Sequence, residues 1–313
     1  MTICNVGSRK LSAGDDYGSQ AWSVFAPNLT IYGFDADADA CEAANADIAT
    51  RQVNWREVHI PIALGKANEE RTLYVTKHPM CSSLYEPNEP FLAHFQHLPE
   101  LSNLDFSFII DTTTLDDFCA QEGIEQIDFL QIDVQGADLE VLQGGTRMLD
   151  RGVLAIQVEV EFAPLYKKQP LFSDVDIFLR KQGFTFFDLG CAYCLRHTAP
   201  IRGKVHNGQL IFGDAFYFRD LLDTTGNEQF KTPAYLFKLA CIADVLDFPD
   251  YACEILEYLT INAGSNSEYN FADILLEGLY FGVGKEHLNS LPVINNITNY
   301  LSDRGKQLLE SSQ

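Results

Sequence analysis

The sequence predicts an α/β protein in which a largely parallel sheet carries helices on its faces, followed by an all-α C-terminal appendage. Up to about residue 219, short apolar runs of strand length alternate with segments of helical periodicity, as in βαβ units. From residue 224 onward the strand pattern stops and apolar residues recur at helical spacing. We therefore expect two domains, residues 1–223 and residues 224–313.

Composition limits the classes of partner. The 313 residues, 46% of them hydrophobic, suffice for one full core and a second small unit. The 22 basic and 44 acidic residues give a formal charge of -22, which repels phosphate backbones and anionic membranes. No apolar run approaches the ~20 residues that span a bilayer, and the first residues lack a signal-peptide pattern. We expect a cytoplasmic protein that binds neither nucleic acid nor a membrane.

The eight cysteines follow no regular framework, which in a chain of this length indicates reduced thiols. Cys191, Cys194 and His197 have the spacing of half a zinc site. A structural zinc ion needs four ligands, and the sequence offers no second pair. We therefore interpret these thiols as core or loop residues and expect no metal.

The first strand is predicted over Met1–Arg9 and is interrupted at Gly7, where a missing Cβ lets the backbone approach a ligand closely. A helix over Ser19–Pro27 and a second strand over Leu29–Phe34 follow, and Asp35 ends that strand. In a nucleotide-binding α/β unit, an acid at this position accepts hydrogen bonds from both ribose hydroxyls. The alternative is that Asp35 belongs to a polar surface turn.

Further strands are predicted over Glu57–Gly65, Arg71–Thr76 and Phe106–Ile110. Between the last two, Ser82 and Ser83 either donate hydrogen bonds to a ligand or end a loop.

His94 and His97 are spaced to lie on one side of a helix, between Pro90 and Pro99. No acidic or cysteine partner lies nearby at metal-ligand spacing, so a general base is a better interpretation of His94 than a metal ligand. Thr114 is a natural N-cap for the helix that follows the strand at 106–110.

The segment Ile127–Gly145 has the pattern of a buried strand, a tight turn and a helix. Asp133 ends the apolar run and Gly136 frees the backbone. In a parallel sheet this turn lies at the carboxyl edge, where ligands bind and a carboxylate faces the ligand. The alternative is that Asp133 caps the helix.

The next strand, Val153–Val160, carries Glu159 and Glu161 at its end. Alternate residues of a strand point the same way, so the two carboxylates lie on one side of it. They either bind an acceptor hydroxyl or are acids at the edge of the sheet. A helix over Leu171–Gln182 and strands over Phe184–Leu189 and Gly208–Arg219 complete this part.

Four helices are predicted in the C-terminal region, and together they form a small bundle. Three roles are open to this bundle: pairing of subunits into a homo-oligomer, cover of the acceptor site, or binding of a partner. The predicted helices are Ala234–Val245, Tyr251–Thr260, Ala272–Phe281 and Val293–Leu309.

Ile127–Gly145 resembles the signature segment of the FkbM family of S-adenosylmethionine-dependent methyltransferases. Gln131, Gln135 and Asp138 stand where the family pattern has Lys, Glu and Glu. The resemblance extends in order through further landmarks of residues 1–219, which are Asn5-Val6-Gly7, Gly33-Phe34-Asp35-Ala36-Asp37, Ala63-Leu64-Gly65, Ser82-Ser83-Leu84 and Gly213-Asp214-Ala215.

This resemblance implies a Rossmann-like methyltransferase sheet that binds S-adenosyl-L-methionine and transfers its methyl group to a hydroxyl of a glycan or secondary metabolite. Cofactor-binding roles then fall to Asn5, Gly7, Asp35, Ala63 and Asp111. Catalytic roles fall to Asp133, Glu159 and His94.

Two other functions remain open. A nicotinamide-dependent oxidoreductase also uses an acid after the second strand, but no G-x-G-x-x-G follows the first strand to hold a pyrophosphate. A non-catalytic binding module on the same fold is favoured by Asn5 and Gln135, which replace expected acids.

Overall fold

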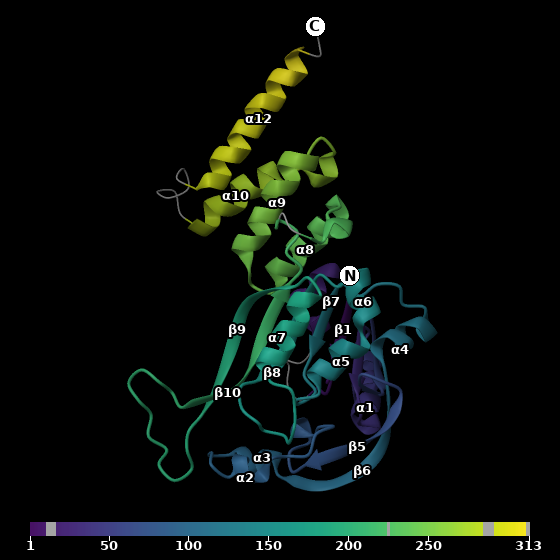
Figure 1. The fold of residues 1–313 in the computed structure, drawn as a ribbon. Coiled ribbons are helices and arrows are strands. Elements are labelled where there is room, and N and C mark those ends of the chain that lie inside the picture. The colour runs from purple at the N-terminus through teal and green to yellow at the C-terminus, as the bar shows by residue number, and fades with distance from the viewer. Residues whose placement is uncertain (11–16, 224–225, 284–290, 311–313) are drawn as a thin grey trace. The chain divides into compact units, whose positions relative to one another are not determined.

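The computed structural model describes residues 1–10, 17–223, 226–283 and 291–310 (Figure 1). The chain divides into two compact units, Met1–Asp220 and Leu221–Gln313. The sequence-based boundary between residues 223 and 224 lies close to this division.

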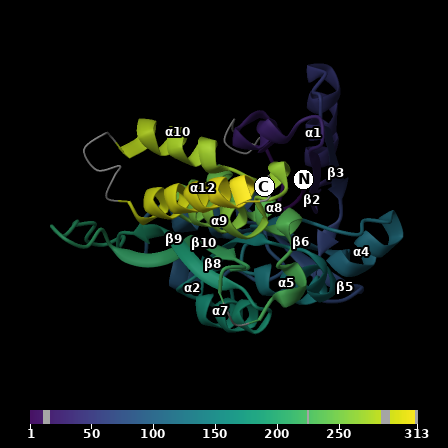
Figure 2. The ribbon, with the colours of Figure 1, turned by 90° about the horizontal axis from the view of Figure 1, so that it is seen from above.

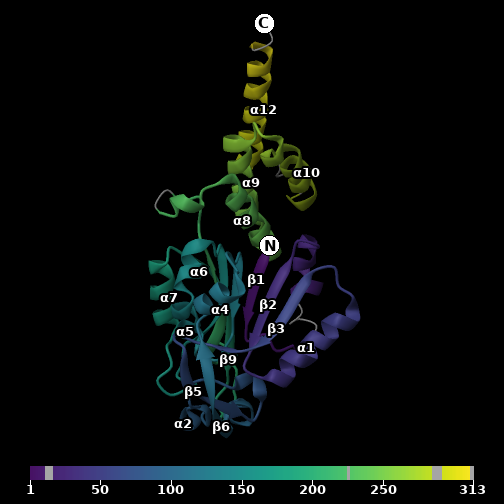
Figure 3. The same ribbon diagram turned by 90° about the vertical axis from the view of Figure 1, so that its right-hand side faces the viewer.

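The first unit is built on a seven-stranded sheet in the order β3-β2-β1-β7-β8-β10-β9 (Figures 1 and 3). Its first five strands are parallel, and β10 runs antiparallel to both of its neighbours. The bounds are β1 Thr2–Val6, β2 Thr30–Asp35, β3 Arg56–Pro61, β7 Phe129–Ile132, β8 Ala155–Glu161, β9 Thr185–Cys194 and β10 Gln209–Phe218.

Helices cover both faces of this sheet, which confirms the predicted α/β class (Figure 2). On one face of the sheet, residues of α4, α5, α6 and α7 form the main apolar core with the strands. On the other face, α1 packs against β2 and β3. The bounds are α1 Ala38–Arg51, α4 Leu115–Glu122, α5 Asp138–Gly144, α6 Thr146–Arg151 and α7 Phe172–Lys181.

Near the carboxyl ends of β1, β7 and β8 the two faces of the sheet differ in polarity, because alternate residues of each strand point to opposite sides. Val6, Ile132 and Val158 belong to the apolar core beneath the helices. Asn5, Gln131 and Gln157 occupy neighbouring register positions on the opposite face. The amide oxygens of Asn5 and Gln131 are buried there without a hydrogen-bond partner in the described part of the chain.

A second, three-stranded sheet has the order β4-β6-β5. Its strands are β4 Ala63–Leu64, β5 Glu69–Thr76 and β6 Leu104–Thr113. The single strand predicted over residues 57–65 is therefore wrong, because the chain leaves the large sheet after Pro61 and enters the small one at Ala63. Short helices, α2 Glu89–Leu92 and α3 Leu98–Ser102, lie between β5 and β6 in the sequence.

Two local predictions also need correction. The helix expected over residues 19–27 consists of two 3-10 turns, Tyr17–Ser19 and Ala21–Phe25, anchored where the Trp22 ring stacks on Phe129 at 4.8 Å. No helix was predicted between Asp35 and Glu57, where the structure has α1. Asp37 is the N-cap and its side chain accepts hydrogen bonds from the backbone of Asp39 and Ala40.

The second unit is helical, as expected. Its helices are α8 Pro233–Val245, α9 Pro249–Ala263, α10 Ala272–Val283 and α12 Pro292–Glu310. Leu239 of α8 and Ile255 of α9 are fully buried, and the Phe237 and Phe271 rings stack at 5.3 Å. Across the described ranges, no helix has the length and apolarity needed to cross a bilayer.

Gly7 offers a test of how tightly β1 and β7 meet. Its φ of +86° is unfavourable for other residues, and a Cβ there would lie 1.9 Å from the carbonyl oxygen of Asp133. We expect Gly7→Ala to destabilise the protein by about 3 kcal/mol or more, since it combines strain with a backbone clash. Chemical denaturation measures this loss.

Gly123→Ala is the matched control, because Gly123 has φ +68° and nothing within 4 Å of an added Cβ. That variant should lose about 1–2 kcal/mol, the cost of the left-handed conformation alone. Equal losses in the two variants would show that the close approach at Gly7 is not a constraint.

Candidate active site

A cavity of about 680 Å³ lies in the first unit, at the carboxyl ends of β1, β2 and β7 and against the small sheet. These strands include the switch point of the large sheet, since β2 and β7 flank β1 on opposite sides. Ligands of open α/β sheets bind in the crevice at this point. The residues that line the cavity include Gly7, Arg9, Asp35, Ala63, Leu73, Val75, Thr76, Ser82, Ser83, Phe106, Phe108, Asp133 and Gln135.

The floor of the cavity is fixed by backbone contacts between the strand ends. The Gly7 and Ser8 amides both donate to the carbonyl of Phe34, and the Asp133 amide donates to the carbonyl of Val6. The sequence predicts close approach of a ligand to Gly7. The structure shows that the residue packed against Gly7 is Asp133 of the neighbouring strand end.

Asp35 projects into the cavity from the end of β2. Its Oδ1 accepts a hydrogen bond of 2.8 Å from the Asp37 amide, and its Oδ2 lies 3.8 Å from the Arg9 guanidinium, which also pairs with Asp37. Burial raises the pKa of Asp35, an effect that the Asp37 amide and Arg9 partly offset. A half-buried carboxylate with spare acceptor capacity suits paired hydroxyl groups of a ligand.

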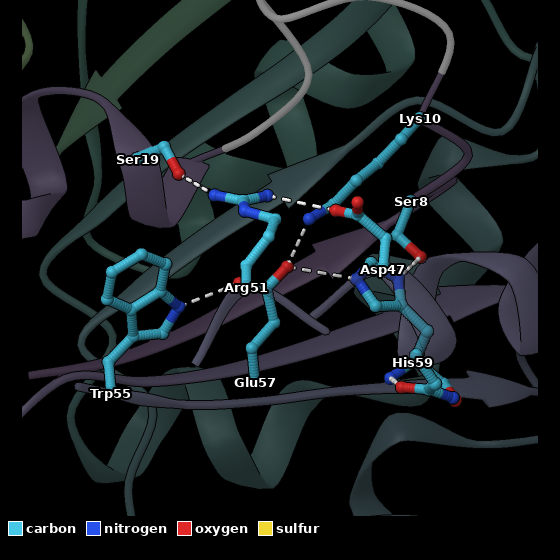
Figure 4. Close-up of polar contacts among 9 residues, drawn as sticks. Ser8, Lys10, Ser19, Asp47, Arg51, Trp55, Glu57 and His59 are labelled. Carbon is cyan, nitrogen blue, oxygen red and sulfur yellow. Dashed lines mark hydrogen bonds and ion pairs between the residues drawn. The ribbon is translucent and has the colours of Figure 1, made fainter. Parts of the chain in front are cut away.

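A buried network holds the loop that carries Arg9 (Figure 4). His59 of β3 bonds to Ser8 Oγ through Nδ1 at 2.9 Å and to Glu57 through Nε2 at 3.0 Å. Glu57 also accepts hydrogen bonds from Lys10 and Trp55. Burial alone would raise the pKa of Glu57, but these three donors outweigh it and lower the pKa to about 2. The loop after Gly7 is thus tied to β3.

At the end of β7, Asp133 and Glu159 are linked through Gln135. The Gln135 side-chain amide donates to Asp133 Oδ1 at 2.8 Å and to Glu159 Oε2 at 2.6 Å. Its oxygen accepts a hydrogen bond of 2.9 Å from the Tyr166 hydroxyl. A neutral amide can donate to both acids, whereas the Glu of the family pattern would add a third carboxylate.

The acids behind Asp133 have raised pKa values. Burial raises the pKa of Glu159 well above its ordinary value, and the charge of Asp133 raises it further. Burial and the nearby Asp138 and Asp133 raise the pKa of Glu161 as well. Burial and Asp133 raise the pKa of Asp138 to about 7. Glu161 Oε1 has no hydrogen-bond partner among the described residues.

The structure brings together four of the eight predicted site residues: Gly7, Asp35, Ala63 and Asp133 all line the cavity. Glu159 is buried directly behind Asp133. The remaining three residues, Asn5, Asp111 and His94, do not line the cavity.

Asn5, Asp111 and His94 lie in three different parts of the first unit. Asn5 is buried within β1, Asp111 is exposed on β6 opposite Glu70, and His94 is exposed between α2 and α3. A part for Asp111 and His94 in the site therefore stays a prediction, which their positions outside the cavity lining do not support. In the described part of the chain, no group of three or more acids, histidines or cysteines is arranged to hold a metal ion.

Three residues of the site were missed or misjudged from the sequence. Gln135 was treated as a lost charge, although its place two residues after Asp133 was a signal of a role there. Arg9 directly follows the Gly7 turn, which was a signal too. Tyr166 reaches Gln135 from a loop after β8, and no local pattern pointed to it.

Comparison with known proteins decides the family. The profile described as the methyltransferase FkbM domain matches residues 26–186, about half of the 313 residues. The chain belongs to the FkbM methyltransferase family. The predicted family is thereby confirmed, and membership agrees with the predicted cofactor, S-adenosylmethionine.

A curated relative of this FkbM protein is the 2-O-methyltransferase NoeI of Sinorhizobium fredii, 36% identical over 84 residues. The matched stretch is 26% of this chain and 34% of the relative, so the chain spans about a third of the length of the curated relative it matches.

Similar solved structures include two methyltransferases. Methyltransferase FkbM from Methylobacillus flagellatus KT has a TM-score of 0.38 and 12% identity, covering 69% of this chain and 43% of that one. Magnesium protoporphyrin IX methyltransferase from Synechocystis PCC 6803 with bound SAM has a TM-score of 0.35 and 10% identity, covering 70% of this chain and 69% of that one.

The Gln135 bridge predicts a pH-dependent loss of stability in Gln135→Glu. A third acid beside Asp133 and Glu159 must take up a proton on folding, so its folded pKa lies above its unfolded value of about 4.3. The penalty is therefore small near pH 4 and grows as pH rises. We expect a loss of about 1–3 kcal/mol at pH 8 and a smaller one at pH 5, measured by urea denaturation.

Gln143→Glu, an exposed glutamine of α5, is the control and should change stability little at either pH. A loss in Gln135→Glu that is the same at pH 5 and pH 8 would contradict the bridge between two acids.

Proposed function

We propose that the protein is an S-adenosylmethionine-dependent O-methyltransferase whose acceptor is a hydroxyl group of a glycan or secondary metabolite. The observation that carries the proposal is the pair of acids, Asp35 after β2 and Asp133 after β7, which line one switch-point cavity in a chain of the FkbM family. Asp35 serves the donor and Asp133 serves the acceptor.

The residues present fit the donor. The cavity volume of about 680 Å³ lies within the ~300–1,000 Å³ typical of small-molecule sites. Asp35, held by Arg9 and the Asp37 amide, would accept hydrogen bonds from ribose hydroxyls, and Ala63 would lie beside the base. S-adenosylmethionine supplies an electrophilic methyl group on a sulfonium.

Oxygen is favoured as the methyl acceptor because the site contains a suitable proton acceptor. An alcohol that gains a methyl group must lose its proton, and a positioned carboxylate accelerates such transfers by ~10²–10⁴. Asp133 Oδ1 is occupied by Gln135, so Oδ2 is the atom that would take the proton. The name of the matching relative, a 2-O-methyltransferase, supports the same acceptor atom.

Glu159 and Gln135 would position Asp133 rather than touch the acceptor. Glu159 lies behind Asp133, and burial together with the charge of Asp133 raises the pKa of Glu159 and so favours its neutral form beside the reacting carboxylate. Alignment of the reactants then contributes the rest of the acceleration, which reaches several kcal/mol for a well-oriented pair. Family membership favours this chemistry over the nicotinamide-dependent alternative.

Separate roles for the two acids predict separate defects. Asp35→Ala should weaken binding of S-adenosylhomocysteine by roughly ten- to a hundredfold, because a hydrogen bond to a charged group contributes about 1.5–3 kcal/mol. Asp133→Asn keeps the side-chain shape and loses basicity, so it should preserve that affinity and lower single-turnover methyl transfer by about a hundredfold or more. Calorimetry and single-turnover kinetics on both variants measure the two effects.

Asp105→Asn, which removes a charge elsewhere on the cavity wall, is the control and should show neither defect. If Asp133→Asn loses donor binding while Asp35→Ala keeps it, the two roles are reversed.

A further inference from the structure

The small sheet presents an apolar wall to the cavity. The Phe106 and Phe108 side chains are 53% and 45% exposed, and their rings stack with centroids 6.0 Å apart. In register, Val75 pairs with Phe106 and Leu73 pairs with Phe108, so all four side chains lie on one face of β5 and β6. All four line the cavity.

Phe106 and Phe108 differ from the other exposed apolar residues in their position. Of the large hydrophobic side chains that are well exposed in the described ranges, only Phe106 and Phe108 line the cavity. Ile109, on the other face of β6, is 61% exposed and does not line it. Adjacent aromatic rings left uncovered at a site indicate a ligand contact.

Several of the other residues that line the cavity are polar. Asp133 and Asp35 project from the large sheet, and the hydroxyl-bearing residues Thr76, Ser82 and Ser83 lie nearby. Ser83 Oγ donates to the Gln135 carbonyl at 2.6 Å, which ties this part of the wall to the turn that follows Asp133. The ligand that complements such a cavity has one apolar C–H face and a rim of hydroxyl groups.

A pyranose ring has this combination, because its axial C–H groups stack on aromatic faces while its hydroxyls point outward. We propose that Phe106 and Phe108 form a platform on which the sugar ring of the acceptor stacks, presenting a hydroxyl to Asp133. The inference rests on the proposed O-methyl transfer and identifies the residues that select its acceptor. In this proposal the donor is bound by Asp35 and by the carboxyl ends of β1, β2 and β7.

Phe106→Ala/Phe108→Ala tests the platform, and Ile109→Ala is the matched control on the opposite face of the same strand. The probes are the methyl glycosides of glucose, galactose, mannose and N-acetylglucosamine, with cyclohexanol as an apolar alcohol. Binding to the protein saturated with S-adenosylhomocysteine is measured by saturation-transfer NMR. Calorimetry measures S-adenosylhomocysteine affinity for each variant.

We expect at least one glycoside to bind the natural protein through its axial C–H protons, more tightly than cyclohexanol. The double variant should lose roughly tenfold in glycoside affinity. Ile109→Ala should keep that affinity, and all three proteins should bind S-adenosylhomocysteine equally.

Glycoside binding that is unchanged in the double variant, or absent from the natural protein, would overturn the platform. A weakened affinity for S-adenosylhomocysteine in the double variant alone would also overturn it, by showing that the rings hold the donor. Failure of the natural protein to bind S-adenosylhomocysteine at all would instead contradict the proposed function.

Discussion

The candidate site depends on the close approach of the Gly7 backbone to the carbonyl of Asp133. A Cβ at residue 7 would lie 1.9 Å from that oxygen, so glycine is the residue that lets the loop after β1 pass the end of β7. The same two strand ends set the positions of Asp35, through the Phe34 carbonyl, and of Asp133, through the Val6 carbonyl. Two acids from distant parts of the sequence therefore share one cavity.

The second constraint on the candidate site is repulsion among the buried acids around Asp133. The charge of Asp133 raises the pKa values of Asp138, Glu159 and Glu161, in a region where burial already disfavours ionisation. Gln135 links the acids without adding a charge, because its neutral side chain donates hydrogen bonds to Asp133 and Glu159 and accepts one from Tyr166. The departure from the family pattern at residue 135 thus has a local physical reason.

Much of the fold was readable from the sequence, because strands buried in a parallel sheet appear as short apolar runs followed by polar turns. Asp133 and Asp35 were found for this reason: each ends such a run. The passage of the chain from the large sheet to the small sheet at Ile62 could not be predicted, because an apolar run does not show which strand it pairs with.

The partners of the site were harder to predict for the same reason. Tyr166 reaches Gln135 across 31 positions of the chain, and Phe106 faces the cavity because of its register with Val75. His94 and Asp111 were suggested by residue type and resemblance, but their positions follow from tertiary packing, which leaves both exposed.

The most direct test of the account is a calorimetric titration of the natural protein with S-adenosylhomocysteine and, separately, with NAD. The account predicts saturable binding of one S-adenosylhomocysteine per chain and no binding of NAD, because Asp35 lines the cavity and suits a ribose, whereas the sequence has no G-x-G-x-x-G after the first strand to hold a pyrophosphate. Binding of NAD with no heat from S-adenosylhomocysteine would contradict it.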